Sequence, residues 1–322
     1  MTALVECIPN FSEGSDAATL DALATAIQGG GAWLLDRTAD VDHERSVFTM
    51  AGGPPEVVAA STAAVEVAIE RIDMRTQRGQ HPRIGAADVI PFVPLGSTSL
   101  EACIEEARRF AAVIAERFDL PVYLYAEAAR RPDRRILSGI RRAGYEGLAA
   151  WMAAPGHGPD LGPAQPHPTA GATTVGARRM LIAFNIQLTT SDVALARRIA
   201  ARIRERDGGL AALQALGLWL ASEGRAQVSM NLLDHERTPL WQVWEEVGRL
   251  ARAEGVEAFD SELIGLAPVA AFVAVADHIG VPPDRPLEEQ VREATSWLRM
   301  RRPSPDMALE LRLARFRRDV PA

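Results

Sequence analysis

Residues 79–92 combine a histidine, an arginine and small residues directly before an apolar run. Pro82 biases the preceding His81 toward an extended backbone, and Gly85 permits the close approach of another chain segment or a ligand. An imidazole on a stiffened loop, with a pKa near neutrality, is suited to moving protons. We therefore take His81 as a candidate catalytic base, and a surface histidine in a turn as the alternative.

The composition limits what such a base could act on. The net charge of −7 argues against general nucleic-acid binding. All 35 basic residues are arginine, so an anionic ligand must be bound by guanidinium groups, backbone N–H groups or helix N-termini. The start of the chain lacks the pattern of a signal peptide, and no apolar run is long enough to span a bilayer. Cys7 and Cys103 stand alone in apolar surroundings, which favours reduced thiols and a cytoplasmic protein.

The elements that must position these residues occur in the same order twice along the 322 residues. In the first half the patterns predict strands and helices at residues 5–9, 15–27, 32–36, 45–50, 54–71 and 87–93, followed by a helix at 99–118 and a strand at 122–125. In the second half they predict strands at 180–186, 213–220, 226–233 and 257–266. They also predict a helix that begins near residue 190, a helix at 239–253 and a helical tail after Pro286. This order predicts an α/β (α+β) fold of two ferredoxin-like βαββαβ subdomains packed around an interdomain cleft. We place the subdomains at residues 1–178 and 179–322.

Residues 156–172 are too rich in glycine and proline for a helix or a strand. Composition alone favours an inter-domain linker. A segment in this position could also form the wall of a ligand-binding cleft, because clefts between domains are frequent binding sites.

Several runs together resemble one known family. The matching runs are residues 4–14, 45–47, 79–86, 121–129, 171–178, 181–185 and 226–233. In order and spacing the chain resembles the formiminotransferase family, the transferases of histidine degradation and folate one-carbon metabolism. The resemblance implies transfer of the formimino group from N-formimino-L-glutamate to N5 of tetrahydrofolate, giving 5-formiminotetrahydrofolate and glutamate.

The resemblance also implies particular roles. It implies that His81 is the catalytic base and that a loop binds the folate, with the residues Gly162, Pro163, Ala164, Gln165, Pro166, His167, Pro168, Thr169, Ala170 and Gly171. The chain leaves no room for the cyclodeaminase domain that is fused in animal relatives, so we expect a stand-alone transferase and a separate cyclodeaminase. The family and the exposed sheet edges of small split units predict a homodimer.

The chemistry suggests further candidates. The second ring nitrogen of His81 needs an orienting acceptor, and a carboxylate would also tune its basicity; the candidates, which the sequence does not rank, are Asp36, Asp40, Asp42 and Asp88. Both substrates carry carboxylates, for which guanidinium groups are suited; the candidates are Arg45, Arg83 and Arg178, with structural ion pairs as the alternative. Asn10 is a further substrate-binding candidate at a strand end. No histidine pair has the spacing of a zinc site, so we predict no metal.

Three positions depart from the animal members of the family. Thr38 and Glu44 stand where those enzymes have aspartate and asparagine, and Thr169–Ala170 stands where they have a large aromatic residue. Two alternatives therefore stay open. The chain could be a folate-dependent formyl or formimino transferase for a different amine donor, or a folate-binding homologue without turnover.

Overall fold

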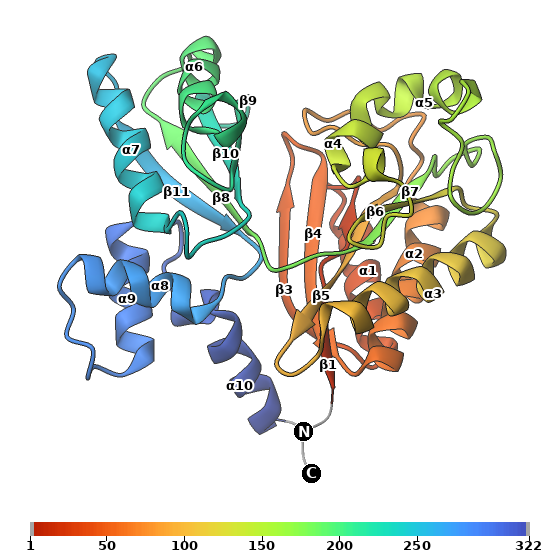
Figure 1. Cartoon of the computed structure of the whole chain (residues 1–322), viewed down its shortest axis with the longest axis horizontal. Helices are drawn as coiled ribbons and strands as arrows, with labels where there is room; N and C mark the ends of the chain where they lie inside the picture. Colours follow the sequence, from red (N-terminus) through yellow and green to blue (C-terminus); the bar gives the residue numbers. More distant parts are fainter. Residues whose placement is uncertain (1–2, 320–322) are drawn as a thin grey trace. The chain divides into compact units, whose positions relative to one another are not determined.

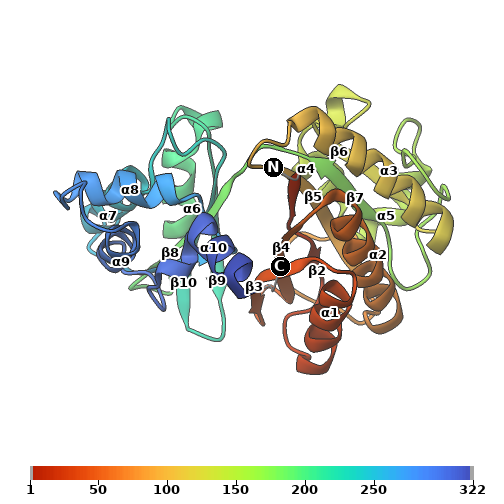
Figure 2. The same ribbon diagram turned by 90° about the horizontal axis from the view of Figure 1, so that it is seen from below.

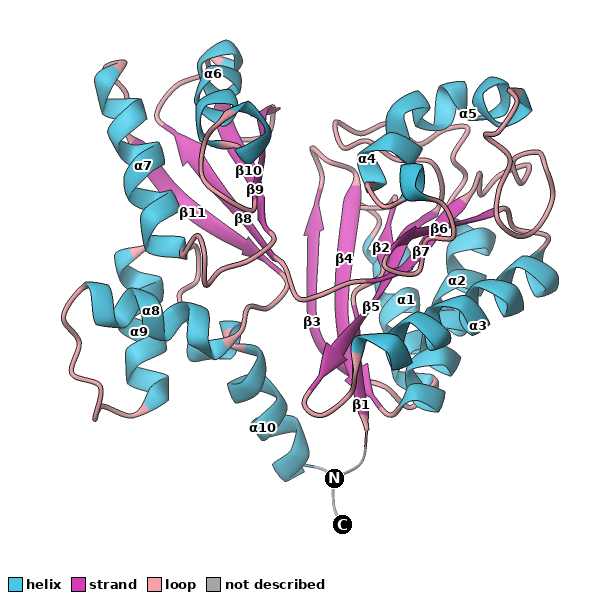
Figure 3. Ribbon diagram, in the orientation of Figure 1, coloured by secondary structure: helices cyan, strands magenta, loops and turns pink. Residues whose placement is uncertain are grey.

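The computed structural model describes residues 3–319 and divides the chain into two compact units, Met1–Arg179 and Met180–Ala322. Each unit contains one β-sheet with helices packed on it (Figure 1, Figure 3). The prediction of a mixed α/β fold with two sheets is confirmed.

The first unit begins with a ferredoxin-like βαββαβ order. Its elements are β1 (Leu4–Cys7), β2 (Asn10–Phe11), α1 (Ala17–Gly29), β3 (Trp33–Asp40), β4 (Arg45–Gly52), α2 (Pro54–Arg71), β5 (Ala87–Leu95), α3 (Leu100–Phe118), β6 (Val122–Ala126), α4 (Leu137–Ile140), α5 (Gly144–Ala153) and β7 (Thr173–Ala177). Strands β1 and β2 each pair antiparallel with both β4 and β5, so they form one interrupted strand. Pro9 stands at the interruption, where it cannot donate to the ladder. Strands β7 and β6 then extend the sheet in parallel beyond β5.

Alternation along the strands gives this sheet two chemically different faces. Phe48 and Met50 of β4 belong to the main apolar core, on the face covered by α1, α2 and α3 (Figure 1, Figure 2). Arg45 points to the opposite face, and Asn10 is directly opposite Val47 in the ladder, so its side chain shares that face. A smaller apolar cluster under α4 and α5 covers the β6 end of the same face.

The second unit repeats the order and continues into helices. Its elements are β8 (Ile182–Leu188), α6 (Val193–Ile203), β9 (Leu213–Leu220), β10 (Arg225–Leu232), α7 (Leu240–Ala253), β11 (Ala258–Ile264), α8 (Val269–His278), α9 (Leu287–Trp297) and α10 (Leu309–Asp319). The antiparallel strand order β11-β8-β10-β9 is that of a ferredoxin-like sheet. Helix α6 begins after Asp192, whose side chain accepts hydrogen bonds from the N–H groups of Ala194 and Leu195.

Sequence patterns missed β7, α4, α5 and α8. Strand β7 reads Thr-Thr-Val-Gly-Ala, which has too little apolar alternation to predict a strand after the Gly/Pro-rich run. Helices α4, α5 and α8 have no side-chain cap at their N-termini. Packing against the rest of their units determines the structure of all four segments. No helix within residues 3–319 combines the length and the apolar content needed to cross a bilayer.

Candidate active site

His81 lies in the loop between α2 and β5, where a guanidinium group holds its ring. Nη1 of Arg45 donates to Nε2 of His81 at 2.7 Å, and Nη2 of Arg45 donates to Oδ1 of Asn10. A guanidinium has donors only, so Nε2 of His81 must accept. The neutral imidazole therefore carries its hydrogen on Nδ1.

The surroundings keep His81 neutral. Its pKa lies well below the ordinary value, first because burial penalises the charged ring, and then because Arg45, Arg141 and His43 oppose a positive charge there. Burial also lowers the pKa of Arg45 to about 10, which leaves this guanidinium charged at neutral pH. A histidine that is neutral at pH 7 can accept a proton from a substrate.

The lowered pKa of His81 predicts a direction for stability against pH. Below the unfolded-state pKa of about 6.5, the unfolded chain binds a proton that the folded chain does not, so the free energy of unfolding falls as the pH drops from about 6.5 toward the folded-state pKa. Above about 6.5 this contribution is fully present. Urea unfolding between pH 5 and 8 should show a smaller acid loss of stability for His81→Asn than for the unmodified chain. Equal slopes would contradict the lowered pKa of His81 in the folded chain.

The carboxylate of Asp88 pairs with Arg141 and not with His81. Its Oδ1 accepts from the backbone N–H of Ile84 at 2.8 Å, and its Oδ2 accepts from Nη2 of Arg141 in a largely buried ion pair. The ladder between β2 and β5 shifts register between the pairs Asn10–Val89 and Phe11–Ala87, which leaves Asp88 as the extra residue. The irregularity in the strand thus presents this carboxylate to Arg141.

Asp40 faces a second histidine. Its Oδ1 accepts from the backbone N–H groups of Asp42 and His43, both at 2.8 Å, and its Oδ2 lies 3.5 Å from Nδ1 of His43. Asp42 occupies the same turn, and Asp36 is opposite Thr49 farther along β3. The sequence predicts a carboxylate at the second ring nitrogen of His81. Asp40 and Asp88 have the partners given above, and the side chain that contacts the His81 ring is Arg45, at Nε2.

The predicted substrate-binding arginines have different surroundings. Arg83 donates from Nη2 to Oε1 of Glu146 at 2.9 Å and to the carbonyl of Gln77 at 2.7 Å. The contact with Glu146 is an ion pair, which was the alternative to substrate binding for this residue. Arg178 donates from Nη1 to the carbonyl of Arg179 at 3.0 Å. Burial raises the pKa of Tyr125 against the opposing effect of Arg178 and Arg141. Arg45, Arg141 and Arg178 thus form a linked set of cations around His81 and Tyr125.

Sequence reasoning assigned no role to Arg141, Tyr125 or His43. Arg141 lies outside every matching run, among other arginines that read as a solvated surface. Tyr125 lies inside the matching run 121–129, on a predicted strand. Membership of that run could have marked Tyr125 as a candidate site residue. His43 follows two aspartates and reads as part of a solvated turn, because its burial depends on contacts from residues far along the chain.

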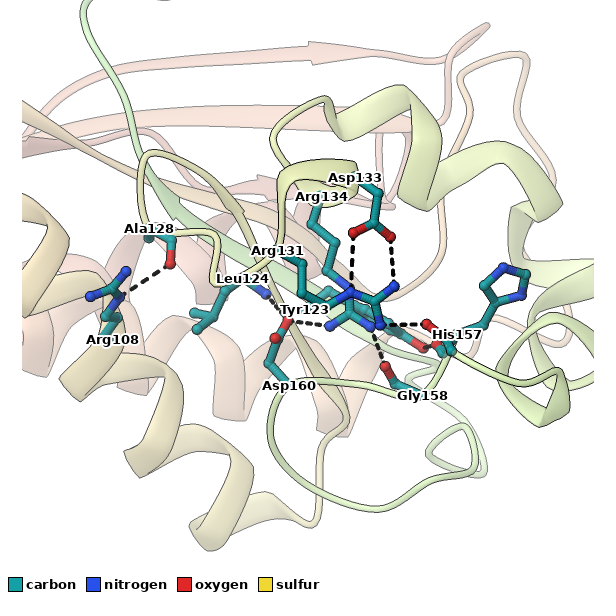
Figure 4. A network of polar contacts seen from close by, with 11 residues as sticks. Arg108, Tyr123, Leu124, Ala128, Arg131, Asp133, Arg134, His157, Gly158 and Asp160 are labelled. Atoms are coloured by element: carbon teal, nitrogen blue, oxygen red, sulfur yellow. Dashed lines mark hydrogen bonds and ion pairs between the residues drawn. The ribbon is translucent and has the colours of Figure 1, made fainter.

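The Gly/Pro-rich segment 156–172 is packed within the first unit. Arg134 donates to Oδ2 of Asp160 and to the carbonyl of Gly158, and Asp160 also accepts from the N–H of Leu124 in β6 at 2.8 Å (Figure 4). The hydroxyl of Tyr123 donates to the carbonyl of His157 at 2.9 Å. These contacts bind one end of the segment to the edge strand β6, so the segment is an ordered part of the first unit rather than a free linker.

The other end of the segment pairs with the chain that carries His81. The N–H of Ala86 donates to the carbonyl of Ala170 at 2.9 Å, and the N–H of Ala172 donates to the carbonyl of Ile84 at 3.0 Å. Gly85 lies directly opposite Gly171 in this short antiparallel bridge. A Cβ on Gly85 would come within 2.0 Å of the carbonyl oxygen of Ala172. The close approach therefore requires glycine, and it joins the predicted folate loop to the segment of the predicted base.

We expect Gly85→Ala to lower both stability and activity, because the added methyl must push the two segments apart. Thermal unfolding and a steady-state assay would measure the two losses. Gly29→Ala is the matched control, since a Cβ at that helix end meets nothing within 4 Å. A Gly85→Ala protein with unchanged melting temperature and turnover would contradict the role of the bridge.

The predicted folate-binding residues 162–171 form a compact turn. Nδ1 of His167 accepts from the backbone N–H of Ala170 at 3.0 Å and from that of Thr169 at 3.3 Å. The N–H of His167 donates to the carbonyl of Gly171 at 2.8 Å, and the N–H of Met74 donates to the carbonyl of Thr169 at 2.9 Å. His167 thus holds the shape of the turn with Nδ1, and neutral His167 carries its hydrogen on Nε2.

The second unit has a separate hollow of about 360 Å³, and none of the candidate residues above lines it. Its walls include Trp244 and Trp297 with the exposed charges of Arg252 and Glu257. The convergent buried polar groups typical of a specific site are found around His81 instead.

The chain thus has two ferredoxin-like units, and the first holds a neutral histidine among arginines. The first unit matches the model of the formiminotransferase domain, N-terminal subdomain, over residues 4–178. The second unit matches the model of the formiminotransferase domain over residues 183–290. The chain belongs to the formiminotransferase family.

Curated relatives agree with this assignment. The chain is 40% identical to a glutamate formimidoyltransferase of Streptococcus pyogenes, covering 91% of this chain and 98% of the relative. It is 42% identical to a glutamate formimidoyltransferase of Thermoplasma acidophilum, covering 86% and 92%. It is also 44% identical to a formimidoyltransferase-cyclodeaminase of Gallus gallus, where the match covers 86% of this chain and 52% of that longer protein.

Proposed function

We propose that this chain is a transferase that moves the formimino group from N-formimino-L-glutamate to N5 of tetrahydrofolate. The observation that carries the proposal is the neutral His81, held by Arg45 on the segment that Gly85 and Gly171 join to the predicted folate loop. The base and the loop thus belong to one ordered substructure. The names of the two microbial relatives support the same reaction.

The reaction needs one proton to be moved between two nitrogens. Folate supplies a nucleophilic amine at N5. The bond from that nitrogen to the formimino carbon forms, the bond from this carbon to the glutamate nitrogen breaks, and the glutamate nitrogen gains a proton. His81 takes the proton at Nε2 and then returns it to the departing nitrogen, which is the work of a single imidazole acting as base and then acid.

Arg45 must release His81 before this step. In the present arrangement Arg45 donates to the same Nε2 that has to accept the proton. A substrate carboxylate is a stronger partner for a guanidinium than a neutral imidazole. Binding of the donor to Arg45 would therefore free the basic nitrogen only when substrate is present.

Arg141 and Arg178 are the further carboxylate ligands that we propose. They act together on Tyr125, and the Nε group of Arg141 is buried without a hydrogen-bond partner among the described residues. A buried unsatisfied donor is costly unless a ligand meets it. Asn10 would orient Arg45, and Arg83 would serve the fold through Glu146.

For the folate, we propose that residues 162–171 form one wall of its site. The loop is held at both ends by backbone hydrogen bonds, so little ordering is needed on binding. Thr169 and Ala170 already use their N–H groups within the turn. Contact with folate would then come from the Nε2 of His167 and from the surfaces of the prolines.

We also propose a homodimer in the cytoplasm that works with a separate cyclodeaminase. Two animal relatives are named formimidoyltransferase-cyclodeaminase, and the match to this chain covers 52% of the length of each. A bacterial relative of the length of this chain carries the transferase name alone. No metal takes part in the steps above.

Thr38 and Glu44 support a second candidate function, that of a transferase for a different amine donor. The hydroxyl oxygen of Thr38 is buried without a hydrogen-bond partner among the described residues, and Glu44 adopts a left-handed backbone with φ 46° while its Oε2 accepts from the N–H of Gly14. Both positions border the turn that leads to Arg45. They could reshape the pocket for the donor without altering the base.

The test is a steady-state assay with tetrahydrofolate and a panel of donors, following the formation of 5-formiminotetrahydrofolate by absorbance. We expect the highest kcat/KM with N-formimino-L-glutamate. A clear preference for another formimino or formyl amine would favour the second candidate. Calorimetry that detects folate binding without turnover of any donor would indicate a binding protein.

A further inference from the structure

The turn between β3 and β4 is fastened to the segment that carries His81. The N–H of Gln80 donates to the carbonyl of Asp42 at 3.1 Å. A Cβ on Gly79 would come within 2.3 Å of the carbonyl oxygen of His43, so only glycine allows this approach. Two segments far apart in sequence, each with one histidine, are thus held against each other.

His43 is buried and its two ring nitrogens have different surroundings. Its side chain is 8% exposed, and its Nδ1 faces the carboxylate of Asp40 at 3.5 Å. A carboxylate favours the tautomer with hydrogen on Nδ1. Nε2 is then an acceptor, and it is buried without a hydrogen-bond partner in the described part of the chain.

His81 offers the complementary group. Because Arg45 donates to its Nε2, neutral His81 carries a donor at Nδ1. The backbone carbonyl of Pro82 also attracts this ring donor, so a partner on His43 would share it. The two imidazole rings lie 6.2 Å apart between centroids, at an interplanar angle of 55°. That separation suits a link through one bridging water between a donor on His81 and an acceptor on His43.

The charges around the two rings differ, and this difference determines how such a link would affect protonation of His81. His81 is exposed to the positive charges of Arg45 and Arg141, so its imidazolium form is disfavoured when it takes a proton. His43 faces Asp40 and Asp42, which favour a positive charge there, and Arg45, which opposes it; burial is the largest effect and lowers its pKa. A protonated His43 would oppose a positive charge on His81, but burial lowers the pKa of His43 and keeps its ring neutral at pH 7. Through this neutral ring, Asp40 is placed to stabilise a proton on His81.

We propose that Asp40 and His43 form a positioning pair that fixes the tautomer of His81 and stabilises its imidazolium during proton transfer. The inference rests on the proposed function, in which His81 is the base. It supplies the carboxylate that the sequence predicts for His81, but through an intervening imidazole rather than by direct contact. His43 does not touch the substrate, so it is a positioning residue and not a catalytic one.

The test uses the full chain with three variants. His43→Leu removes the acceptor, His43→Gln keeps an acceptor oxygen, and Asp40→Asn removes the charge behind the imidazole. We expect His43→Leu to lower kcat by about tenfold to a hundredfold, the range for a lost hydrogen bond to a charged group, with both KM values nearly unchanged. His43→Gln should recover most of the loss, which a purely packing role would not predict.

The pH profile gives an independent measurement. Removing the negative charge of Asp40 leaves His81 beside two arginines, so Asp40→Asn should lower the pKa of His81 and shift the acid limb of kcat/KM to lower pH. His278→Leu is the control, because His278 pairs with Glu245 in the second unit at 2.9 Å. It should leave the profile unchanged.

Nitrogen-15 NMR of labelled histidine tests the pair without any turnover. The resting protein should give a His81 signal with the hydrogen on Nδ1, and His43→Leu should disturb that signal. Unchanged kcat, pH profile and tautomer in His43→Leu and Asp40→Asn would overturn the pairing, even if His81 itself proves essential. An inactive unmodified protein would instead reject the proposed function, and the NMR result would still decide the pairing.

Discussion

Replacing His81 by alanine is expected to lower turnover by roughly 10²–10⁴-fold, the usual contribution of a positioned general base. The variant loses the nitrogen that takes the proton from folate N5 and returns it to the glutamate nitrogen. Arg45 remains in place for the carboxylate of the donor, so the KM values should change much less than kcat. Steady-state kinetics with both substrates, at saturating and limiting concentrations, measures the two effects separately.

The matched control is His278→Ala. This histidine is also packed against aromatic rings and bonded to a charged group, since it stacks on Trp241 at 4.1 Å and pairs with Glu245. It belongs to the second unit, whereas every residue assigned to the site belongs to the first. His81→Ala with the turnover of the unmodified protein would remove this residue from the mechanism, whereas equal losses in both variants would point to a general effect of losing a packed histidine.

Removing the carboxylate of Asp160 is expected to destabilise the protein by about 3–5 kcal/mol, the typical loss when one partner of a buried ion pair is deleted. The side chains of Arg134 and Asp160 are only 5% and 6% exposed. In Asp160→Ala the guanidinium keeps the carbonyl of Gly158 and the face of the Tyr123 ring, at 5.0 Å from its centroid, but no opposing charge. Urea unfolding would measure the loss.

Two further variants make this prediction specific. Asp133→Ala removes one side of the neighbouring pair between Arg131 and Asp133, whose side chains are 42% and 58% exposed. It should lower the free energy of unfolding much less than Asp160→Ala, because water screens an exposed pair. Arg134→Leu combined with Asp160→Asn removes the buried charge but keeps an acceptor for Leu124, and should be more stable than Asp160→Ala. Similar losses for Asp160→Ala and Asp133→Ala would show that burial of the pair contributes nothing.

The same pair links stability to the proposed function. Because Asp160 anchors the segment that continues into residues 162–171, Asp160→Ala should also raise the KM for tetrahydrofolate more than the KM for the donor. Equal changes in the two KM values would show that anchoring of the segment by Asp160 does not affect folate binding specifically.

Much of this site was accessible from the sequence. The stiffened segment around His81 and the matching runs predict the base, and the lack of lysine leaves arginines, backbone N–H groups and helix N-termini to bind an anion. Regular alternation and helix caps predict most of both βαββαβ units, because these signals arise from neighbouring residues. Strand β7 was missed because its small residues become a strand only between β5 and β6.

The sequence by itself determined the class of chemistry, since a histidine before proline and an all-arginine set of cations are local facts of residue type. Only the tertiary structure decided which groups surround that histidine. Asp88 turns to Arg141 through a register shift in β5, and His43 is buried by a turn that packs against Gly79. Burial and charge at one ring depend on segments up to about sixty residues apart, and no local pattern encodes the approach of such segments, because backbone geometry and packing establish it only when the chain has folded.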